Sequence, residues 1–417
     1  LQVVPAEVLA NNTTTSQFNW NFDSGSESFD YLAVGEALVL TYSLTLTDSF
    51  GEADTQEVVI TITGTNDQPE ISAITQSASL TEADGAAQLT ANGDITWSDR
   101  DSNGSVTLTP TYNGDIAWSA GDITQPLNAD QITALTSTGD GKAFSITGVD
   151  QDGWQYSAAQ NLDFLRNGET LTLSFNVVAS DDSGAIDGSD TSAPPKVVTI
   201  TLTGTNDQPE ISAITQTGAA NELDGAAQLN ATGAITWDDL DANDIVTITP
   251  TYNGDIEWSD GTNVFDLNAE LNGAQIDALT TDAFSITSVG GDQNGWQYSA
   301  AQNLDFLRKD ETLTLSFNVV ARDDSGAGND TSAPPKVVTI TLTGTNDQPE
   351  ISAITQTGAA IELDGAAALN ATGLITWDDL DANDTVTITP TYNGDIEWSD
   401  GTNVFDLNAE LNGAQID

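Results

Sequence analysis

The sequence predicts an all-β protein made of tandem antiparallel β-sandwiches arranged end to end, and three observations indicate this fold. First, the phrase GTNDQPE occurs at 64–70, 204–210 and 344–350, a spacing of 140 residues. Second, apolar residues alternate with Thr and Ser over 169–179 and 196–205, the period of a half-buried strand. Third, NG, DG and SG pairs interrupt these runs at short intervals, which is typical of a sandwich.

Long identical segments define the repeats. Residues 190–220 are identical to 330–360, and 246–277 are identical to 386–417. Self-similarity of this kind indicates an array of one structural unit. The domains predicted from it are the rear part of a diverged sandwich at 1–63, complete repeats at 64–203 and 204–343, and the front part of a repeat at 344–417.

Within a repeat, the alternation assigns the inward face of each strand. The inward residues are Leu171, Leu173, Phe175 and Val177 in one strand and Val198, Ile200 and Leu202 in the next. Pro194 and Pro195 form a loop before that second strand, because proline cannot join a central strand. The segment 127–136 and its relative near 267–280 predict a short helix on the side of the sandwich.

Composition limits the chemistry of the chain. Among 417 residues there are 64 Asp and Glu, 8 Lys and Arg and no His or Cys, giving a net charge of −56. Nucleic acid and anionic membranes are therefore poor partners, and no stretch of about 18 apolar residues predicts membrane insertion. Without thiolates or imidazoles, only oxygen ligands remain for a metal, which favours calcium.

Paired aspartates recur beside turns in each repeat. The pairs are Asp99 and Asp101, Asp239 and Asp241, and Asp379 and Asp381. Two carboxylates in one Asp-x-Asp loop lie within reach of one ion. These loops are not EF-hands, because the twelfth position, which needs a bidentate Glu, is Pro110 in the first repeat and Pro250 in the second.

The ending GTND-x-P, followed about thirty residues later by Asp-x-Asp and then by GWQYSAAQNLDFLRNGETLTLSFNVVASDDSG, resembles the VCBS repeat family. The resemblance runs through all four pieces of the chain. It implies cadherin-like, immunoglobulin-like β-sandwich modules from the extender region of giant bacterial RTX adhesins exported by type I secretion. It also implies calcium bound between successive domains.

The resemblance further implies a set of metal ligands at each of three junctions. At the first junction the set is Asn66, Asp67, Asp99, Asp101 and Asp181, with Asp30 from the preceding domain. At the second it is Asn206, Asp207, Asp239, Asp241 and Asp323, with Glu82 and Asp163 from the preceding domain. At the third it is Asn346, Asp347, Asp379 and Asp381, with Glu222 and Asp305 from the preceding domain.

The linker departs from the cadherin pattern at one position. Cadherin linkers read Asp-x-Asn-Asp, whereas this one reads Gly64-Thr65-Asn66-Asp67. Because one carboxylate is lost, we expect one or two calcium ions per junction. Two carboxylates about 4 Å apart repel by about 4 kcal/mol at an effective dielectric of about 20, so a cation is needed to hold the linker closed.

The predicted function is a structural one. The chain is expected to be a calcium-stiffened stalk on the bacterial cell surface, which projects a distal adhesive domain for cell adhesion or biofilm formation. Its partners would be calcium ions, neighbouring repeats and, through domains outside this chain, surface glycans or other cells. No catalytic constellation is present, since His, Cys and a Gly-rich phosphate loop are all missing.

Two alternatives remain open. Tryptophans such as Trp118 and Trp258 lie beside turns and would form a glycan-binding or cell-binding surface if they were exposed, whereas Trp154 alternates with Tyr156 as a core strand does. The pieces 1–63 and 344–417 together contain nearly as many residues as one repeat. They would therefore support a head-to-tail polymer through completion of a split domain.

Overall fold

A computed structural model describes the chain in two compact units. The described residues are 1–4, 14–124, 126–184, 190–192, 194–288, 293–362, 364–365 and 368–406. One unit comprises Leu1–Ser212, Trp237–Thr249 and Val320–Pro335, and the other Ala213–Thr236, Pro250–Val319 and Lys336–Asp417. Ala193 of the predicted proline loop and the end of the predicted front piece, 407–417, lie outside the described residues.

The first repeat is a sandwich of two sheets within the first unit. One sheet has the order β10 (Phe144–Thr147), β11 (Gly153–Ala159), β7 (Gln88–Ser98) and β5 (Glu70–Ile74). The other has the order β6 (Ser77–Thr81), β13 (Lys196–Thr203), β12 (Thr170–Ser180) and β8 (Thr107–Tyr112), with β9 (Ala117–Trp118) also paired to β12. This confirms the all-β sandwich fold.

One pair of strands differs from the antiparallel prediction. The entry strand is divided between the two sheets: β5 pairs antiparallel with β7, whereas β6 pairs in parallel with β13, from Thr199 opposite Ser77 to Thr203 opposite Thr81. The strand changes sheet between Ile74 and Ser77, so β6 reaches the last strand of the repeat. Local alternation in the sequence gives the inward face of a strand but does not identify its partner.

The core consists of the alternating residues that the sequence predicts. Leu171, Leu173, Phe175, Val198 and Ile200 have no exposed area, and Val177 and Leu202 are equally buried. Trp154 is also fully buried, as predicted, and its ring stacks on that of Phe144 with centroids 5.4 Å apart. Burying these side chains is the main favourable contribution to the stability of the sandwich.

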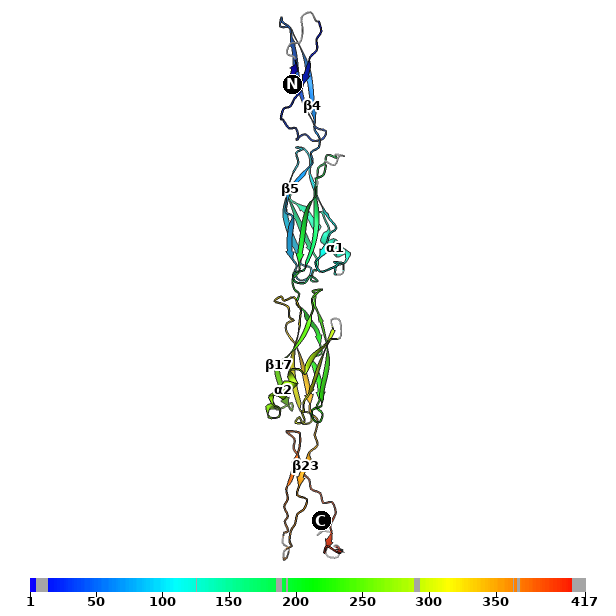
Figure 1. Cartoon of the computed structure of the whole chain (residues 1–417), viewed down its shortest axis with the longest axis vertical. Coiled ribbons are helices and arrows are strands. Elements are labelled where there is room, and N and C mark those ends of the chain that lie inside the picture. The colour runs from blue at the N-terminus through cyan, green and yellow to red at the C-terminus, as the bar shows by residue number, and fades with distance from the viewer. Residues whose placement is uncertain are drawn as a thin grey trace. The chain divides into compact units, whose positions relative to one another are not determined.

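The predicted short helix is present. α1 (Ala129–Thr136) packs beside β11 at the edge of the first sandwich (Figure 1). Asn128 begins it with a capping box, in which its side chain accepts from the amide of Gln131 and the Gln131 side chain accepts from the amide of Asn128.

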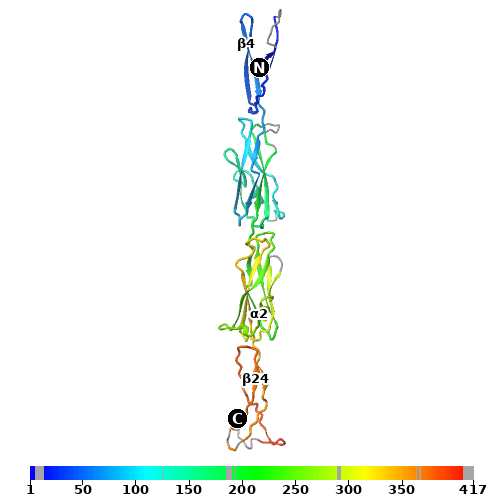
Figure 2. The same ribbon diagram turned by 60° about the vertical axis from the view of Figure 1, so that its left-hand side comes forward.

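The second repeat forms two sheets of the same kind. One sheet has the order β14 (Glu210–Ile214), β16 (Gln228–Asp238), β20 (Gln293–Ala301) and β19 (Phe284–Ser288). The other has the order β15 (Thr217–Asn221), β22 (Lys336–Thr343), β21 (Thr312–Arg322), β17 (Thr247–Ser259) and β18 (Val264–Phe265). Between β18 and β19 lie η1 (Leu267–Ala269) and α2 (Gly273–Thr280), the helical segment predicted near 267–280 (Figure 2).

The two end pieces contain short sheets. The N-terminal piece has β1 (Gln2–Val4) paired with β2 (Asn19–Asn21) and β3 (Ala37–Thr47) paired with β4 (Ala53–Thr63). The last piece has β23 (Glu350–Ile354) paired with β24 (Ile375–Asp378) and β25 (Trp398–Ser399) paired with β26 (Val404–Phe405). Within the described residues, no helix is long and apolar enough to cross a bilayer.

The compact units cut through the second repeat. The start of that repeat up to Ser212 and its loops after β16 and β21 belong to the same unit as the whole first repeat, and the rest belongs with the last piece. The boundaries at 63, 203 and 343 therefore stay a prediction. The junctions between repeats, however, lie inside single units, so their side-chain contacts are described below.

Candidate metal centre

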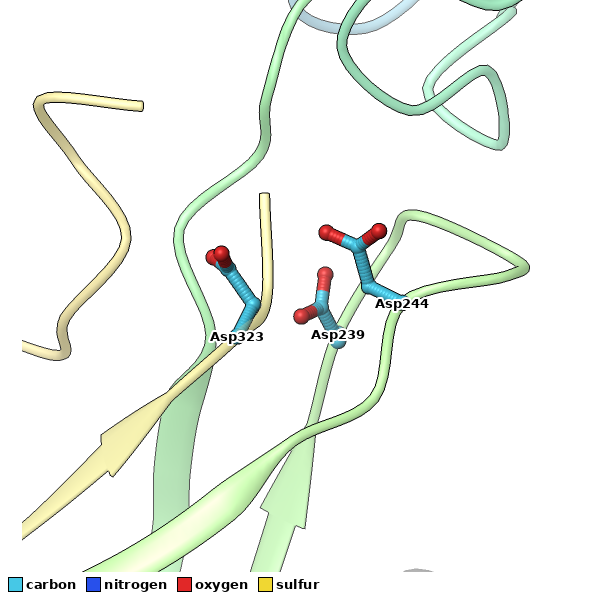
Figure 3. A group of neighbouring side chains, drawn as sticks. All are labelled: Asp239, Asp244 and Asp323. Atoms are coloured by element: carbon cyan, nitrogen blue, oxygen red, sulfur yellow. The ribbon is translucent and has the colours of Figure 1, made fainter. Parts of the chain in front are cut away.

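Three acidic side chains of the second repeat meet where two strands end. Asp239 follows β16 directly, Asp323 follows β21 directly, and Asp244 lies further along the loop that Asp239 begins. One carboxylate oxygen from each lies within 4.8 Å of the others, and Figure 3 shows the three side chains next to one another beyond the ends of the strands. This spacing leaves room for one cation bound to several oxygens.

The linker at this second junction lies against the same cluster. The side-chain amide of Asn206 donates to Asp323 Oδ2 at 3.2 Å, and the backbone amide of Asp207 donates to Asp241 Oδ2 at 2.8 Å. Asn206, Asp207, Asp241 and Asp323 are all buried. The structure therefore brings together the linker residues and the following-domain residues that the sequence predicts.

Several buried oxygens of the second junction accept no hydrogen bond from the described residues. They are Asn206 Oδ1, Asp207 Oδ2, Asp239 Oδ2, Asp241 Oδ1 and both carboxylate oxygens of Asp244. A buried acceptor without a partner costs about 1–3 kcal/mol, and more when it is charged. A bound cation would satisfy these oxygens, and a set made only of carboxylate and amide oxygens fits calcium.

The same burial changes the acidity of these groups. Desolvation, with a smaller contribution from neighbouring carboxylates, raises the pKa of Asp207 and that of Asp241 to about 7 and the pKa of Asp239 to about 6. Near neutral pH, Asp207 and Asp241 would therefore be only partly ionised without a cation beside them. The site is therefore electrostatically incomplete with protein groups alone.

The preceding domain contributes a second acidic group beside Asp207. Glu82 and Asp163 are buried, and their carboxylates, after desolvation, raise the pKa of Asp207. Backbone amides hold both in place: Thr205 donates to Glu82 Oε1 at 2.9 Å and Gly85 donates to Asp163 Oδ1 at 2.7 Å. Glu82 Oε2 is buried and accepts no hydrogen bond within the described residues, so it is a further free ligand atom.

The first junction repeats part of this arrangement. The side-chain amide of Asn66 donates to Asp181 Oδ2 at 3.1 Å, and the amide of Asp67 donates to Asp101 Oδ2 at 2.9 Å. Asp99 Oδ2 and Asp101 Oδ1 are buried and accept no hydrogen bond within the described residues. Burial also raises the pKa of Asp101.

Asp30 differs from its counterpart Asp163. It is exposed, and its carboxylate lies 3.7 Å from Nη1 of Arg100, which is also 4.0 Å from Asp67 Oδ1. The second repeat has Leu240 where the first has Arg100. The structure thus places Asp30 at the junction but beside a guanidinium and open to solvent, not in a buried acidic cluster.

The third junction lies in the second unit and matches the second junction closely. The amide of Asp347 donates to Asp381 Oδ2 at 3.0 Å, the amide of Thr345 to Glu222 Oε2 at 2.6 Å, and the amide of Gly225 to Asp305 Oδ1 at 2.7 Å. The side-chain amide of Asn346 donates to the carbonyl of Asp347. Buried oxygens there that accept no hydrogen bond from the part of the chain that the structure describes are Asp347 Oδ2, Asp379 Oδ2 and Asp381 Oδ1.

The sequence reasoning missed Asp244 and the arginine that contacts it. Nε of Arg166, in the preceding repeat, lies 2.6 Å from Asp244 Oδ1, and Nη2 lies 3.2 Å from Asp324 Oδ1. The signal was present: the second repeat reads DLDAND where the first reads DRDSNG, so Asp244 stands in place of Gly104. As ligands, all the residues named for the three junctions stay a prediction.

Direct contacts also join successive repeats at each junction. The amide of Ala242 donates to the carbonyl of Phe164 at 3.2 Å, and the side-chain amide of Asn243 donates to Glu169 Oε1 at 3.2 Å. At the first junction the corresponding contacts are Ser102 to Tyr31 and Asn103 to Glu36, and at the third Ala382 donates to Phe306. The repeats therefore touch through hydrogen bonds that need no ion.

The glycine that replaces the cadherin carboxylate has a steric cause. A Cβ on Gly204 would lie 2.0 Å from the carbonyl oxygen of Leu165 and 2.6 Å from that of Arg166. Gly64 and Gly344 face equally close carbonyls of the preceding repeat. Because two main-chain carbonyls occupy the space, no side chain fits at this linker position, and an acidic ligand there is excluded.

The tryptophan loops do not form an exposed surface in the second repeat. Trp258 is buried, with its indole N–H donating to Glu311 Oε2 at 2.9 Å and its ring packed edge-on against Phe306. Trp118 is partly buried in the matching position and donates to Glu169 Oε2 at 3.0 Å. The alternative of glycan binding through an exposed Trp258 therefore does not fit the second repeat, because the Trp258 ring is buried against its own repeat.

Comparisons with known proteins assign no family. No family model matches the chain, and no curated protein matches it. Among solved structures, zebrafish RET cadherin-like domains 1 to 4 match at 10% identity and a TM-score of 0.20 over 74% of this chain and 58% of that one. Drosophila N-cadherin EC1-3 matches at 13% identity and 0.19, over 79% of this chain and 82% of that one.

A bacterial protein also occurs among the matches. The sialic acid binding region of a Streptococcus sanguinis adhesin matches at 11% identity and a TM-score of 0.21, over 68% of this chain and 81% of that one. This chain spans little more than half of the zebrafish structure. These scores and identities are too low to assign a function.

Proposed function

We propose that this chain is a spacer of an extracellular bacterial adhesin, and that calcium bound at the repeat junctions stiffens it. The observation that carries the proposal is the set of buried carboxylate oxygens at the second junction that lack hydrogen-bond donors within the described residues. The matching oxygens at the first and third junctions support it, as does the resemblance to VCBS repeats. The absence of His and Cys limits any metal site to oxygen ligands.

A bound cation would replace the repulsion between the carboxylates at the junction by attraction of each carboxylate to the ion. The loops after β16 and β21 present carboxylates to one small space, and the linker contacts the same loops through the side-chain amide of Asn206 and the backbone amide of Asp207. With a cation there, these loops would share one coordination shell, which removes the hinge motion that neighbouring domains have by default. At free calcium about 100-fold above its dissociation constant, one site stabilises the junction by about 2.7 kcal/mol.

The near-identity of the copied segments fits a spacer. Length grows with the number of repeats, and each junction needs the same residues, whereas a catalytic or recognition site needs to be present only once. The identical 190–220 and 330–360 segments carry the linker itself. We therefore place the adhesive activity outside this chain.

Calorimetric titration of the full chain tests the metal binding. We expect calcium to bind with dissociation constants of about 10⁻⁴ to 10⁻³ M, typical of extracellular modules, and magnesium to bind more weakly. Asp239→Asn should remove or weaken binding at one junction by at least about tenfold, because a carboxylate ligand is lost. Asp140→Asn, an exposed change of equal charge away from the junctions, serves as the control and should leave binding unchanged.

Small-angle scattering tests the stalk. In millimolar calcium the maximum dimension of the full chain should be larger and more sharply defined than in chelator, because the hinges are fixed. Identical profiles in the two conditions would contradict the stiffening, even if calorimetry showed binding. Absence of calcium binding at millimolar concentration would contradict the whole proposal.

A further inference from the structure

Arg166 contacts the following repeat more extensively than any other basic side chain of the described residues. Its guanidinium lies 2.6 Å from Asp244 Oδ1 and 3.2 Å from Asp324 Oδ1, and it donates to the carbonyl of Asn243 at 3.4 Å. The Asp244 side chain is fully buried and that of Arg166 is only 25% exposed. Nη2 donates a hydrogen bond to Asp324 Oδ1, whereas the contact between Nε and Asp244 Oδ1 is a close ion pair in which Asp244 accepts no hydrogen bond from the described residues. A largely desolvated ion pair attracts more strongly than one on the surface, because the local dielectric is lower.

The acceptors are themselves fixed by the following repeat. Asp324 Oδ1 also accepts the amide of Ile245 at 3.0 Å, so it ties the loop after β21 to the loop after β16. The amide of Asp244 donates to the carbonyl of Asp241 at 3.3 Å. Arg166 therefore meets two loops whose backbones are tied to one another through Asp324, while the Asp244 carboxylate itself accepts no hydrogen bond within the described residues.

The two halves of this contact occur together along the chain. The repeat that carries Arg166 is followed by a repeat that carries Asp244, and the repeat that carries Arg308 is followed by a piece that carries Asp384. The piece that has Ala33 at the arginine position is followed by Gly104. At the third junction, Nη1 of Arg308 donates to the carbonyl of Asn383 at 3.1 Å, the counterpart of the Arg166 contact with Asn243. The ion pairs of Arg308 are made within its own repeat, with Glu311 Oε1 at 2.9 Å and Asp260 Oδ2 at 3.7 Å, so the contact with a following aspartate is described for Arg166 alone.

From this geometry we propose that Arg166 is a latch that docks the following copy of the repeat through Asp244 and Asp324, and that it holds the junction without a metal ion. The partner surface is the front of a repeat that carries an aspartate at the 244 position. A repeat with glycine there, like the first, lacks half of the latch. Arg166 thus distinguishes the copied repeat from the diverged one at the junction.

The latch also neutralises part of the negative charge that a cation would otherwise have to balance at this junction. Asp244 belongs to the group of three carboxylates with Asp239 and Asp323, and the guanidinium supplies one positive charge to it permanently. The second junction would therefore keep part of its order in chelator, whereas the first, with Ala33 and Gly104, would depend more on the ion. The contact does not rest on the proposed metal site, so the two proposals can fail separately.

Hydrogen–deuterium exchange of the full chain in chelator tests the latch. Arg166→Gln should raise the exchange rate of amides in the segment 239–246 by about tenfold, because the Ala242 and Ile245 amides lose the partner that holds their loop. Segment 379–386 has a different mass, since Thr385 replaces Ile245, and serves as an internal control that should not change. Arg166→Lys should give an intermediate rate, since an ammonium keeps the charge but not the fork.

Arg322→Gln is the matched control variant. Arg322 also forms a two-point pair, with Asp330 at 2.8 Å and 3.2 Å, but inside its own repeat. It should leave segment 239–246 unchanged. Equal exchange in wild type and Arg166→Gln in chelator would overturn the proposal, as would an equal effect of Arg322→Gln.

Transplanting the latch gives a second test that does not depend on loss of stability. Ala33→Arg with Gly104→Asp should slow exchange in segment 99–106 in chelator by severalfold, and neither change alone should do so. The change at Gly104 fits sterically, since a Cβ there meets only ordinary contacts at 3.7 Å or more. Asp182 already occupies the position of Asp324 and accepts the amide of Ser105. No protection in the double variant would overturn the proposal.

Discussion

The first and second junctions share one linker phrase but differ in the residues around it. Both have GTNDQPE, and in both the linker Asp amide donates to the second Asp of the Asp-x-Asp pair. The second junction has an arginine from the preceding repeat, Arg166, on Asp244. The first has an arginine from the following repeat, Arg100, between Asp30 and Asp67.

This difference shows that the linker does not by itself determine how a junction is held. In the second junction the arginine pair is close and mostly buried, whereas in the first the distances are 3.7 and 4.0 Å and Arg100 is 72% exposed. Exposed pairs of this kind contribute about 0–1 kcal/mol. The metal-independent attraction between repeats is therefore stronger at the second junction.

The largest expected effect is a loss of stability on substitution of the linker glycine that both junctions share. Gly204→Ala should lower the free energy of unfolding by about 3 kcal/mol, because the new methyl group would overlap the carbonyl oxygens of Leu165 and Arg166. Gly64→Ala should act in the same way on the first junction. Urea denaturation of each variant measures the loss. Gly328→Ala, at an exposed glycine with open space around it, should change stability little, and a Gly204→Ala variant as stable as this control would refute the steric argument.

The next effect is a pH dependence of the metal-free protein. The pKa values of Asp207 and Asp241 are raised to about 7 and that of Asp239 to about 6, mainly by desolvation. The folded state binds protons on these three carboxyls more tightly than the unfolded state does. Their contribution to the free energy of unfolding is therefore greatest below about pH 4 and falls as the pH rises to about 7.

Exchange rates in chelator at pH 5 and pH 7.5, corrected for intrinsic chemistry, measure this dependence. Segment 239–246 should open more at the higher pH. Calcium should reverse the trend, because its ligands must be deprotonated. A segment that became better protected at pH 7.5 without calcium would contradict the assigned shifts.

The smallest effect comes from the exposed arginine of the first junction. Arg100→Leu installs the residue found at 240 and removes a positive charge 4.0 Å from Asp67 Oδ1. The dissociation constant of calcium at this junction should fall about twofold, in line with an exposed pair worth about 0.5 kcal/mol or less. Calorimetry beside Leu240→Ala, a neutral change at the matching exposed position, checks it. An equal change in both variants would show that Arg100 has no electrostatic role.

Much of the fold could be predicted because the alternation of apolar and polar residues along a strand identifies its buried face. Leu171, Phe175 and Ile200 follow that rule without exception. The linker and Asp-x-Asp residues could also be placed near one another, since they stand at repeat boundaries and strand ends. The exchange of partners by β6 could not, because nothing local in Ser77–Thr81 encodes a neighbour so distant in sequence.

The missed residues of the candidate centre have a common reason. Arg166 and Asp244 belong to different repeats, and each looks like an ordinary surface charge in its own segment. Asp30 matched Asp163 by position, but Asp163 is buried near Asp207, whereas Asp30 is exposed beside Arg100. The position of a residue in the repeat therefore predicts the loop in which it lies but does not predict which side chains surround it.

The parallel pairing of β6 with β13 has a mechanical consequence. These are the entry and exit strands of the first repeat, and β15 and β22 are paired in parallel in the second. Tension applied through the linkers pulls two parallel neighbours in opposite directions along their length. All the hydrogen bonds between them then bear the load together in shear, instead of breaking one after another as at the open end of a hairpin. Each repeat is built to resist extension, independently of what its junctions bind.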